Sequence, residues 1–222
     1  MKKYKNNRGY FDKWEGLKTL GLGMSICGFV IVWAIWQFFY IGVMLLAVGF
    51  ACFLIGNTGR STESEIMDEI GKKCRDLDFK EIETDRYLQK RVPEKVQEYV
   101  FEGFRFADGL CFKKKKDGSV VTSEYIYAKL LLLTDGLYIK CRGFSLLSDE
   151  VNEETVDILA KNIEAMEVVR TDERYTYRKK EYHVKPCRLS VTYDSGKQIL
   201  LPMNDDVYAD EFVAKLKKKI GI

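Results

Sequence analysis

Histidine and proline are scarce in this chain. Among its 222 residues there is one histidine, His183, and there are three prolines. A single imidazole excludes a histidine-rich metal site and any catalytic mechanism that needs two imidazoles. Three prolines exclude a proline-rich linker between domains.

The cysteines lack the close spacing that metal sites require. A zinc site needs at least two closely spaced ligands, and the chain has no Cys-x-x-Cys pair. Cys187 and His183 would share one face of a strand, but a nucleophile pair also needs a third residue that orients the base. We therefore expect no metal, no cofactor and no catalytic residue, and the chain is not predicted to be an enzyme. The six cysteines are Cys27, Cys52, Cys74, Cys111, Cys141 and Cys187.

The chain also lacks a large excess of either charge. It carries 36 Lys and Arg residues against 33 Asp and Glu residues, a formal net charge of +3. This near-balance argues against a dedicated nucleic-acid-binding protein. The charges are placed unevenly: residues 1–18 carry six basic and two acidic groups, whereas residues 60–222 carry 30 and 31. The basic excess therefore lies at the N-terminus.

No charged side chain occurs between Thr19 and Gly59, a run of 41 residues. One helix of that length would extend roughly 60 Å, about twice the hydrocarbon core of a bilayer. A cleaved signal peptide is excluded because its apolar region is much shorter. The pattern predicts a transmembrane helical hairpin over residues 19–57. Its two spans are about Thr19–Trp36 and about Phe39–Gly56, joined by a turn near residues 37–40.

The flanks of this hairpin predict its orientation. The positive-inside rule places both termini in the cytoplasm, in a two-span cell-membrane protein whose integral partner is the lipid bilayer. Trp33, Trp36 and Phe38–Tyr40 would form an aromatic belt at the outer interface. Trp14 and Tyr10 could mark the inner interface. The basic residues are Lys2, Lys3, Lys5, Arg8, Lys13 and Lys18 before the first span and Arg60, Lys72, Lys73 and Arg75 after the second.

Glycines recur at heptad spacing in both spans. Small residues at this spacing on facing helices allow close backbone contact. A turn centred on residues 38–39 would place Gly28 opposite Gly49 and Gly21 opposite Gly56. Three interpretations stay open: packing within the hairpin, an interface with a protein partner, or a chance spacing. No charged group lies within the spans, so we expect an anchor and not an ion pathway. The predicted helix-packing residues are Gly21, Gly28, Gly42, Gly49 and Gly56.

Residues 60–95 are predicted to form a juxtamembrane helical linker. Thr62 and Glu65 have the spacing of a capping box, and apolar residues then recur at helical spacing to about Leu77. This helix could be a stalk, a self-association face, or a helix packed on the domain that follows. Asp78–Val92 is charged and indicates a second short helix.

From residue 96 the apolar period changes to two, which is typical of strands. Hairpin turn signals separate the β-rich runs and indicate antiparallel pairing. The repeated alternation of strand and helix that a doubly wound parallel sheet requires is missing. The turn signals are Asp117-Gly118, Thr134-Asp135-Gly136 and Asp194-Ser195-Gly196.

The last part of the chain combines strands with one helix. Tyr175–Val184 and Arg188–Tyr193 are predicted strands with charged outward faces. Asp205 or Asp206 would cap a C-terminal amphipathic helix. The predicted fold class is therefore α+β: a transmembrane hairpin, then an antiparallel β-sandwich or small barrel over residues 96–222, capped by this helix.

Four segments carry a resemblance to a known family: Tyr127–Lys140, Glu154–Val169, the hairpin Leu189–Met203 and the helix that contains Phe212. Together they resemble the bacterial pleckstrin-homology-like (PH-like) domains. The resemblance covers about residues 123–222, and such domains often follow a pair of transmembrane helices. It implies a PH-like cytoplasmic domain and the role of a membrane-associated scaffold or interaction module, without a catalytic signature.

Four consecutive lysines, Lys113, Lys114, Lys115 and Lys116, precede the Asp117-Gly118 turn. A basic hairpin tip near an inner leaflet could contact anionic lipid headgroups or a partner, at about 1 kcal/mol per lysine. The alternative is a solvated turn whose lysines protect a strand edge.

Two further segments mimic binding motifs. Tyr175–Lys185 interleaves aromatic and basic residues, which could stack single-stranded bases. An amphipathic strand accounts for the same pattern, and no nucleic acid is expected. Ser195-Gly196-Lys197 resembles the end of a phosphate-binding loop, but Val191 stands where an earlier glycine is required.

Two functions remain. In the first, the protein is a membrane-anchored, non-enzymatic module whose PH-like domain docks a protein partner or the inner leaflet. In the second, it is a structural subunit of a larger membrane complex, or a homo-oligomer, assembled through the glycine-lined hairpin.

Overall fold

The structure is a computed structural model that describes residues 2–12, 16–34, 36–205 and 207–222. The chain divides into two compact units, Met1–Ile66 and Met67–Ile222. The described part of the first unit is helical, and the second unit combines antiparallel sheets with helices. The predicted α+β class is therefore confirmed.

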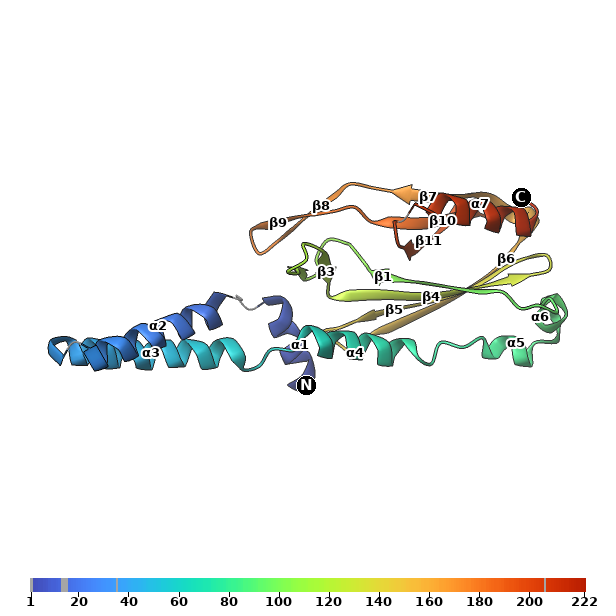
Figure 1. Cartoon of the computed structure of the whole chain (residues 1–222). Helices are drawn as coiled ribbons and strands as arrows, with labels where there is room; N and C mark the ends of the chain where they lie inside the picture. Colours follow the sequence, from blue (N-terminus) through green and yellow to red (C-terminus); the bar gives the residue numbers. More distant parts are fainter. Residues whose placement is uncertain (1, 13–15, 35, 206) are drawn as a thin grey trace. The chain divides into compact units, whose positions relative to one another are not determined.

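An antiparallel pair of apolar helices forms most of the first unit (Figure 1). α2 (Gly16–Ala34) and α3 (Phe39–Asn57) are joined by the short helix η1 (Trp36–Phe38), close to the predicted spans and turn. Both are long and apolar enough to cross a membrane. Within the most apolar stretch of each helix, only 11% and 17% of the residues are buried. Large side chains such as Ile26 and Met44 therefore lie on the outside.

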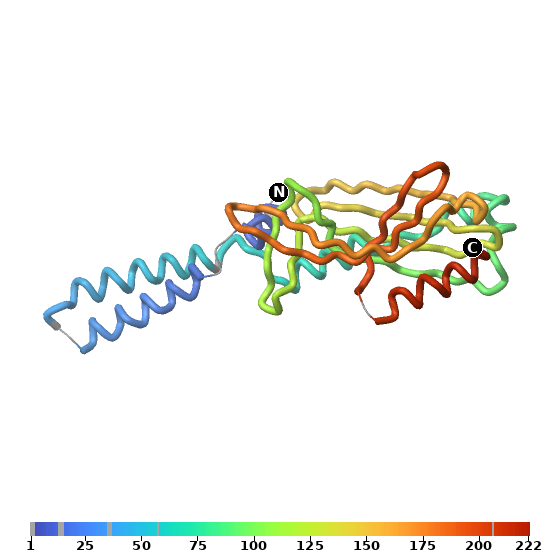
Figure 2. The backbone as a smooth tube through the Cα atoms, turned by 90° about the horizontal axis from the view of Figure 1, so that it is seen from above, coloured from blue at the N-terminus to red at the C-terminus, as the bar shows by residue number. Residues whose placement is uncertain are grey.

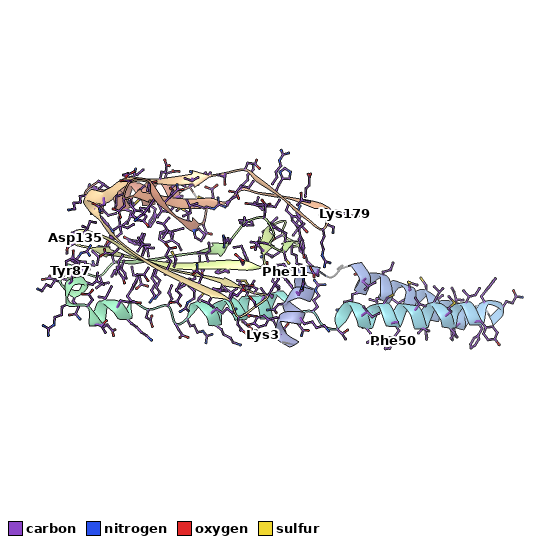
Figure 3. The ribbon with its side chains drawn as sticks, turned by 180° about the vertical axis from the view of Figure 1, so that it is seen from behind. Lys3, Phe11, Phe50, Tyr87, Asp135 and Lys179 are labelled. Carbon is purple, nitrogen blue, oxygen red and sulfur yellow. The ribbon has the colours of Figure 1, made fainter. Side chains whose placement is uncertain are left out.

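Aromatic side chains gather where α2 and α3 meet. Trp33 and Tyr40 are 84% and 86% exposed. Phe50, farther along α3, also points outward, as Figure 3 shows. Trp14, which the sequence predicted at the opposite interface, lies outside the described residues, as does the side chain of Trp36.

The basic N-terminus is a helix, α1 (Lys2–Asp12), that the sequence analysis did not predict. Long-range hydrogen bonds hold it: the Ser61 amide donates to the Asn6 carbonyl at 3.0 Å, and Ser61 Oγ donates to Asn7 Oδ1 at 2.7 Å. Gly9 lies so close to the Gly59 carbonyl that a Cβ would collide with it. These partners are about fifty residues away or more, so no local pattern could reveal them.

The predicted capping box is confirmed. α4 (Glu63–Cys74) begins after Thr62, whose amide donates to Glu65 Oε2 at 2.7 Å while Thr62 Oγ1 accepts from the Glu65 amide at 3.2 Å. The short helix predicted within residues 78–92 is two helices, α5 (Lys80–Thr84) and α6 (Arg86–Arg91). Two form because Asp85 accepts from the Tyr87 amide at 2.8 Å and starts a new helix.

Two larger antiparallel sheets form the centre of the second unit. One has the strand order β1-β4-β5-β6 and the other β11-β10-β7. The described residues form no closed barrel, so of the two predicted architectures the sandwich describes the fold and the barrel does not. The strands of the first sheet are β1 (Glu98–Phe104), β4 (Glu124–Leu133), β5 (Gly136–Ser145) and β6 (Val151–Leu159). Those of the second are β7 (Ile163–Arg170), which follows the short helix η2 (Ala160–Asn162), β10 (Cys187–Tyr193) and β11 (Lys197–Met203).

The four-stranded sheet is covered on both faces (Figure 1). Leu130 and Leu132 of β4 face the second sheet and enter the main core. Leu131 and Leu133 face the other way and pack with Leu88 of α6. This double cover explains why four leucines occur in a row on one strand, since a sheet with one wet face would alternate.

Helix α7 (Ala209–Ile220) packs its apolar side on the main core. Val213 and Leu216 are buried there, and the Phe212 ring lies edge-on to Tyr99 at 5.3 Å between ring centroids. For Asp205 the predicted cap is wrong: the residue before the helix is Tyr208, which makes no side-chain cap hydrogen bond.

The two predicted capping residues have other outcomes. Asp205 instead accepts from Arg170 Nε at 2.7 Å. Asp206 lies outside the described residues.

Charged side chains tie the outer helices to the same sheet. Arg91 is buried, and its guanidinium donates to Asp135 and Asp157, at 2.6 Å each. Lys140 is also buried, and its ammonium donates to Glu81 Oε1 at 2.7 Å, which lowers the pKa of Glu81. Buried cations need such partners, because an unpaired charge in a dry site is strongly destabilising.

Two small hairpins extend from the sandwich beyond its sheets. β2 (Phe112–Lys114) and β3 (Val120–Thr122) form one of them between β1 and β4, and the predicted Asp117-Gly118 turn closes it. β8 (Glu173–Tyr177) and β9 (Lys180–Val184) form the other between β7 and β10.

The single strand predicted over Tyr175–Val184 is therefore wrong. The chain turns at Arg178 and Lys179, which have φ values of 49° and 62°. Glycine or asparagine normally occupies such positions, so the sequence carries no turn signal there. Holding two long side chains in this left-handed region costs on the order of 1–2 kcal/mol per residue.

Candidate functional site

The four predicted lysines do not form one continuous surface. Lys114 and Lys116 are exposed on the β2–β3 hairpin, whereas Lys113 and Lys115 are partly buried. This alternation follows the pleat of the strand, which points successive side chains to opposite faces. Lys115 Nζ also lies 3.6 Å from Asp117 Oδ2. The exposed cations of this hairpin are therefore Lys114 and Lys116.

An aromatic cluster joins the two small hairpins. Phe112 of β2 is almost fully buried, and its ring stacks on Tyr175 of β8 at 5.1 Å between centroids with 25° between the ring planes. Tyr182 of β9 lies 5.4 Å from the same ring. Phe106 and Tyr177 complete the cluster at 6.4–6.5 Å. Segments about sixty residues apart in the sequence are thus held together as one body.

The rings of this cluster pack against one another, stacked or tilted. Base stacking by Tyr175–Lys185 would need exposed ring faces, and here Tyr175, Tyr177 and Tyr182 are partly buried against Phe112. The exposed side chains at the tip of this hairpin are its cations.

Three consecutive cations occupy the tip of the β8–β9 hairpin. Arg178, Lys179 and Lys180 are all exposed, and the Arg178 guanidinium lies over the Tyr177 ring at 5.8 Å. Figure 3 shows Lys179 at the opposite end of this unit from Tyr87 and Asp135. Arg174 is also exposed, but it lies towards the base of its hairpin. We call the five exposed cations nearest the two turns the basic head. It consists of Lys114, Lys116, Arg178, Lys179 and Lys180.

After the apolar run, the two hairpins are basic and the remaining residues are acidic. Residues 112–122 and 173–184 together carry eight basic and three acidic groups, a net charge of +5. The remainder of residues 60–222 carries 22 basic and 28 acidic groups, a net charge of −6. The near-neutral total therefore hides a basic site on an acidic domain.

A charged network fixes the base of the β8–β9 hairpin. Glu173 accepts from Arg188 of β10 at 2.6 and 3.1 Å, and also from the Thr171 and Tyr175 hydroxyls at 2.6 Å each. The hydrogen bonds from Arg188 hold the pKa of Glu173 at about 2. Because both charged side chains are mostly buried, this pair links the hairpin firmly to the three-stranded sheet.

All five predicted glycines lie at the contact between α2 and α3. A Cβ on Gly21 would lie 2.5 Å from the Phe53 amide nitrogen, and one on Gly28 would lie 2.6 Å from that of Leu46. A Cβ on Gly49 would lie 2.6 Å from the Ser25 nitrogen. Gly42 and Gly56 approach backbone atoms of α2 in the same way, at 2.9 Å. Any side chain at these positions would push the helices apart.

The facing pairs differ from the predicted ones. Gly21 lies opposite Gly49 and Gly28 opposite Gly42, instead of Gly56 and Gly49. The reason is the turn, which η1 centres on residues 36–38, one to two positions earlier than the sequence indicated.

The remaining sequence candidates lie apart from these features. Burial raises the pKa of Cys141 to about 12 and that of Cys74 to about 11, so neither thiol ionises readily near neutral pH. Cys187 is buried on β10, whereas His183 is exposed on β9. Ser195-Gly196-Lys197 lies in the predicted hairpin turn and at the start of β11. Within the described residues, no group of three His, Cys, Asp or Glu residues could hold a metal ion.

Replacing Gly21 and Gly28 together by leucine tests the helix contact. We expect the helices to separate, because each leucine would overlap the backbone of α3. Labelling of partly buried Cys52 by N-ethylmaleimide in detergent, measured by mass spectrometry relative to exposed Cys27, should then rise severalfold. Gly23→Leu is the matched control, since nothing lies within 4 Å of a Cβ at Gly23. Unchanged Cys52 labelling in the double variant would contradict this packing.

Replacing Glu173 by glutamine tests the network at the hairpin base. The folded-state pKa is lowered, so this carboxylate stabilises the fold above its ordinary pKa and loses its effect as pH falls towards 2. Glu173→Gln should lower the free energy of unfolding by about 1.5–3 kcal/mol at pH 7, the range for a hydrogen bond to a charged group. Denaturant titrations at several pH values should show that difference shrinking below about pH 4. Glu181→Gln, on the exposed side of the same hairpin, is the control, and a pH-independent difference would refute the assignment.

Comparisons with known proteins point to no relative. No family model, curated protein or solved structure matches the chain. The function is therefore inferred from two features of the chain itself, the apolar hairpin and the basic head.

Proposed function

We propose that this protein is a membrane-anchored, non-enzymatic binding module, whose domain over residues 96–222 docks a protein partner or the inner leaflet. The observation that carries the proposal is the outer surface of the α2–α3 hairpin, which is apolar all round and exposed. Water would hydrate this surface at a high free-energy cost, whereas a bilayer removes it from water.

Neither a soluble core helix nor a signal sequence fits this hairpin well. A core helix of a soluble domain would be mostly buried, but only 11% and 17% of the residues in the apolar stretches of α2 and α3 are buried. A signal sequence would be a single apolar segment, whereas here two helices pack together through glycines on both. A two-span anchor accounts for the length, the composition and the packing.

The charges that flank the hairpin support the proposed orientation. Residues 1–18 are basic, further basic residues follow Gly59, and the connection between α2 and α3 carries none. By the positive-inside rule, both termini and residues 60–222 then lie in the cytoplasm. Trp33 and Tyr40 would lie at the outer interface.

The strand order supports a PH-like domain. The family resemblance implies an antiparallel sandwich or barrel capped by a C-terminal helix, and the chain has two antiparallel sheets with α7 on their shared core. β1 precedes residue 123, where the resemblance starts, and it completes the four-stranded sheet. We therefore place the start of the domain near residue 96, with the small hairpins as additions to it.

The glycine contacts favour a binding module over a complex assembled through the glycines. Each of the five glycines lies against the other helix of the same hairpin. A partner helix in the membrane would therefore meet larger side chains such as Phe29, Met44 and Phe50.

Carbonate extraction of membranes that contain the full chain tests the anchor. We expect the wild-type chain to stay in the membrane pellet. Ile26→Arg with Phe50→Arg should release it, because an arginine near the middle of a span costs about 2.5–3.5 kcal/mol on insertion. Tyr40→Arg is the control and should stay in the pellet, since an arginine at a helix end reaches the interface. Extraction of the wild-type chain into the supernatant would refute the proposal.

A further inference from the structure

The basic head is assembled from two parts of the chain that the fold brings to one place. In both views, the β2–β3 and β8–β9 hairpins extend from the same end of the second unit, away from α6 and the C-terminus (Figures 1 and 2). The aromatic cluster joins the hairpins, so Lys114 and Lys116 on one and Lys179 on the other belong to one rigid surface.

The local structure points to a ligand for these cations. Arg178 and Lys179 occupy two left-handed positions where glycine or asparagine would be unstrained, so the turn holds cationic side chains at the expense of stability. The hairpins carry a net charge of +5 while the rest of residues 60–222 is acidic, which concentrates positive potential at this end.

The chemistry of the head selects phosphate groups over nucleobases. Its aromatic rings pack against one another and are fully or partly buried, so they do not offer open stacking platforms for bases. The exposed groups are four ammonium groups and one guanidinium, which bind phosphate oxygens without reading a sequence. A protein anchored in a bilayer meets such oxygens on anionic phospholipids.

We propose that the basic head binds the phosphates of anionic phospholipid headgroups and thereby docks the domain on the membrane surface. This inference rests on the proposed membrane anchor, and it names the ligand that the docking domain takes. It uses both hairpins jointly: only two of the four lysines predicted from sequence, Lys114 and Lys116, belong to the site, and its other three cations lie on the β8–β9 hairpin.

Lysine footprinting of the full chain tests this proposal. The chain is reconstituted in phosphatidylcholine nanodiscs and in nanodiscs that also contain phosphatidylglycerol, and its lysines are acetylated and quantified by mass spectrometry. Acetylation of Lys114, Lys116, Lys179 and Lys180 should fall about fivefold in the anionic discs, the factor that corresponds to about 1 kcal/mol per cation near an anionic surface. Lys215 and Lys218 on α7, at the other end of the unit, are internal controls and should not change.

Salt and charge reversal separate binding from shielding by the disc. At about 1 M salt the screening length falls to roughly 3 Å, and the difference between the two discs should disappear. Lys114→Glu with Lys179→Glu should remove the protection of Lys116 and Lys180, because the hairpins act together. Lys218→Glu is the matched control and should leave that protection intact.

Three outcomes would overturn the inference. Equal acetylation in both discs would refute headgroup binding while leaving the anchor standing. Protection in zwitterionic discs that appears only when a single-stranded oligonucleotide is added would assign the head to nucleic acid. Protection of the β2–β3 lysines alone would refute a joint site. A chain that fails to enter either disc would instead refute the proposed anchor.

Discussion

The second unit depends on one constraint, which is that its four-stranded sheet is apolar on both faces. The leucines at positions 130–133 point alternately into the main core and towards α6. Such a sheet is stable in water only when both faces are covered. The three-stranded sheet with α7 covers one face, and the helices before β1 cover the other. The helical segment that follows the apolar run is therefore part of the domain's packing from Met67 onward.

Because both faces of the sheet are covered, a charged side chain that lies under the cover needs a partner of opposite charge. Buried Arg91 and Lys140 are held by carboxylates beneath the outer helices, so these cations stabilise the packing and are not offered to a ligand. The two hairpins project beyond the sheets, where their cations stay hydrated. The aromatic cluster joins the two basic hairpins, so their cations form one surface. Packing thus explains why the cations beneath the outer helices are paired and those of the basic head are exposed.

Local patterns predicted most of the fold. The uncharged run, the capping box and three hairpin turns each depend on neighbouring residues, and their elements are present in the structure. Features held by distant partners were missed: α1, which is held through Ser61, and the pairing of Asp205 with Arg170 in place of a helix cap. The turn at Arg178 and Lys179 was missed for a different reason, since its residues disfavour the backbone that they adopt.

The candidate site was only half predictable for the same reason. The run of four lysines is visible in sequence, and the alternating tyrosines at 175 and 177 indicate a strand with one buried face. Nothing local shows that this face meets Phe112 across about sixty residues. The glycines were found by spacing, but their pairing depends on where the turn between α2 and α3 falls, which a shift of one or two residues changes.

Hydrogen exchange of the full chain carrying Phe112→Ala measures the central claim most directly, which is that two distant hairpins form one body. Removing this ring leaves Tyr175 and Tyr182 without their shared partner. We expect the backbone amides of all four hairpin strands, β2, β3, β8 and β9, to exchange faster, while those of β4 and β5 keep their protection. Unchanged exchange in β8 and β9 would contradict that claim.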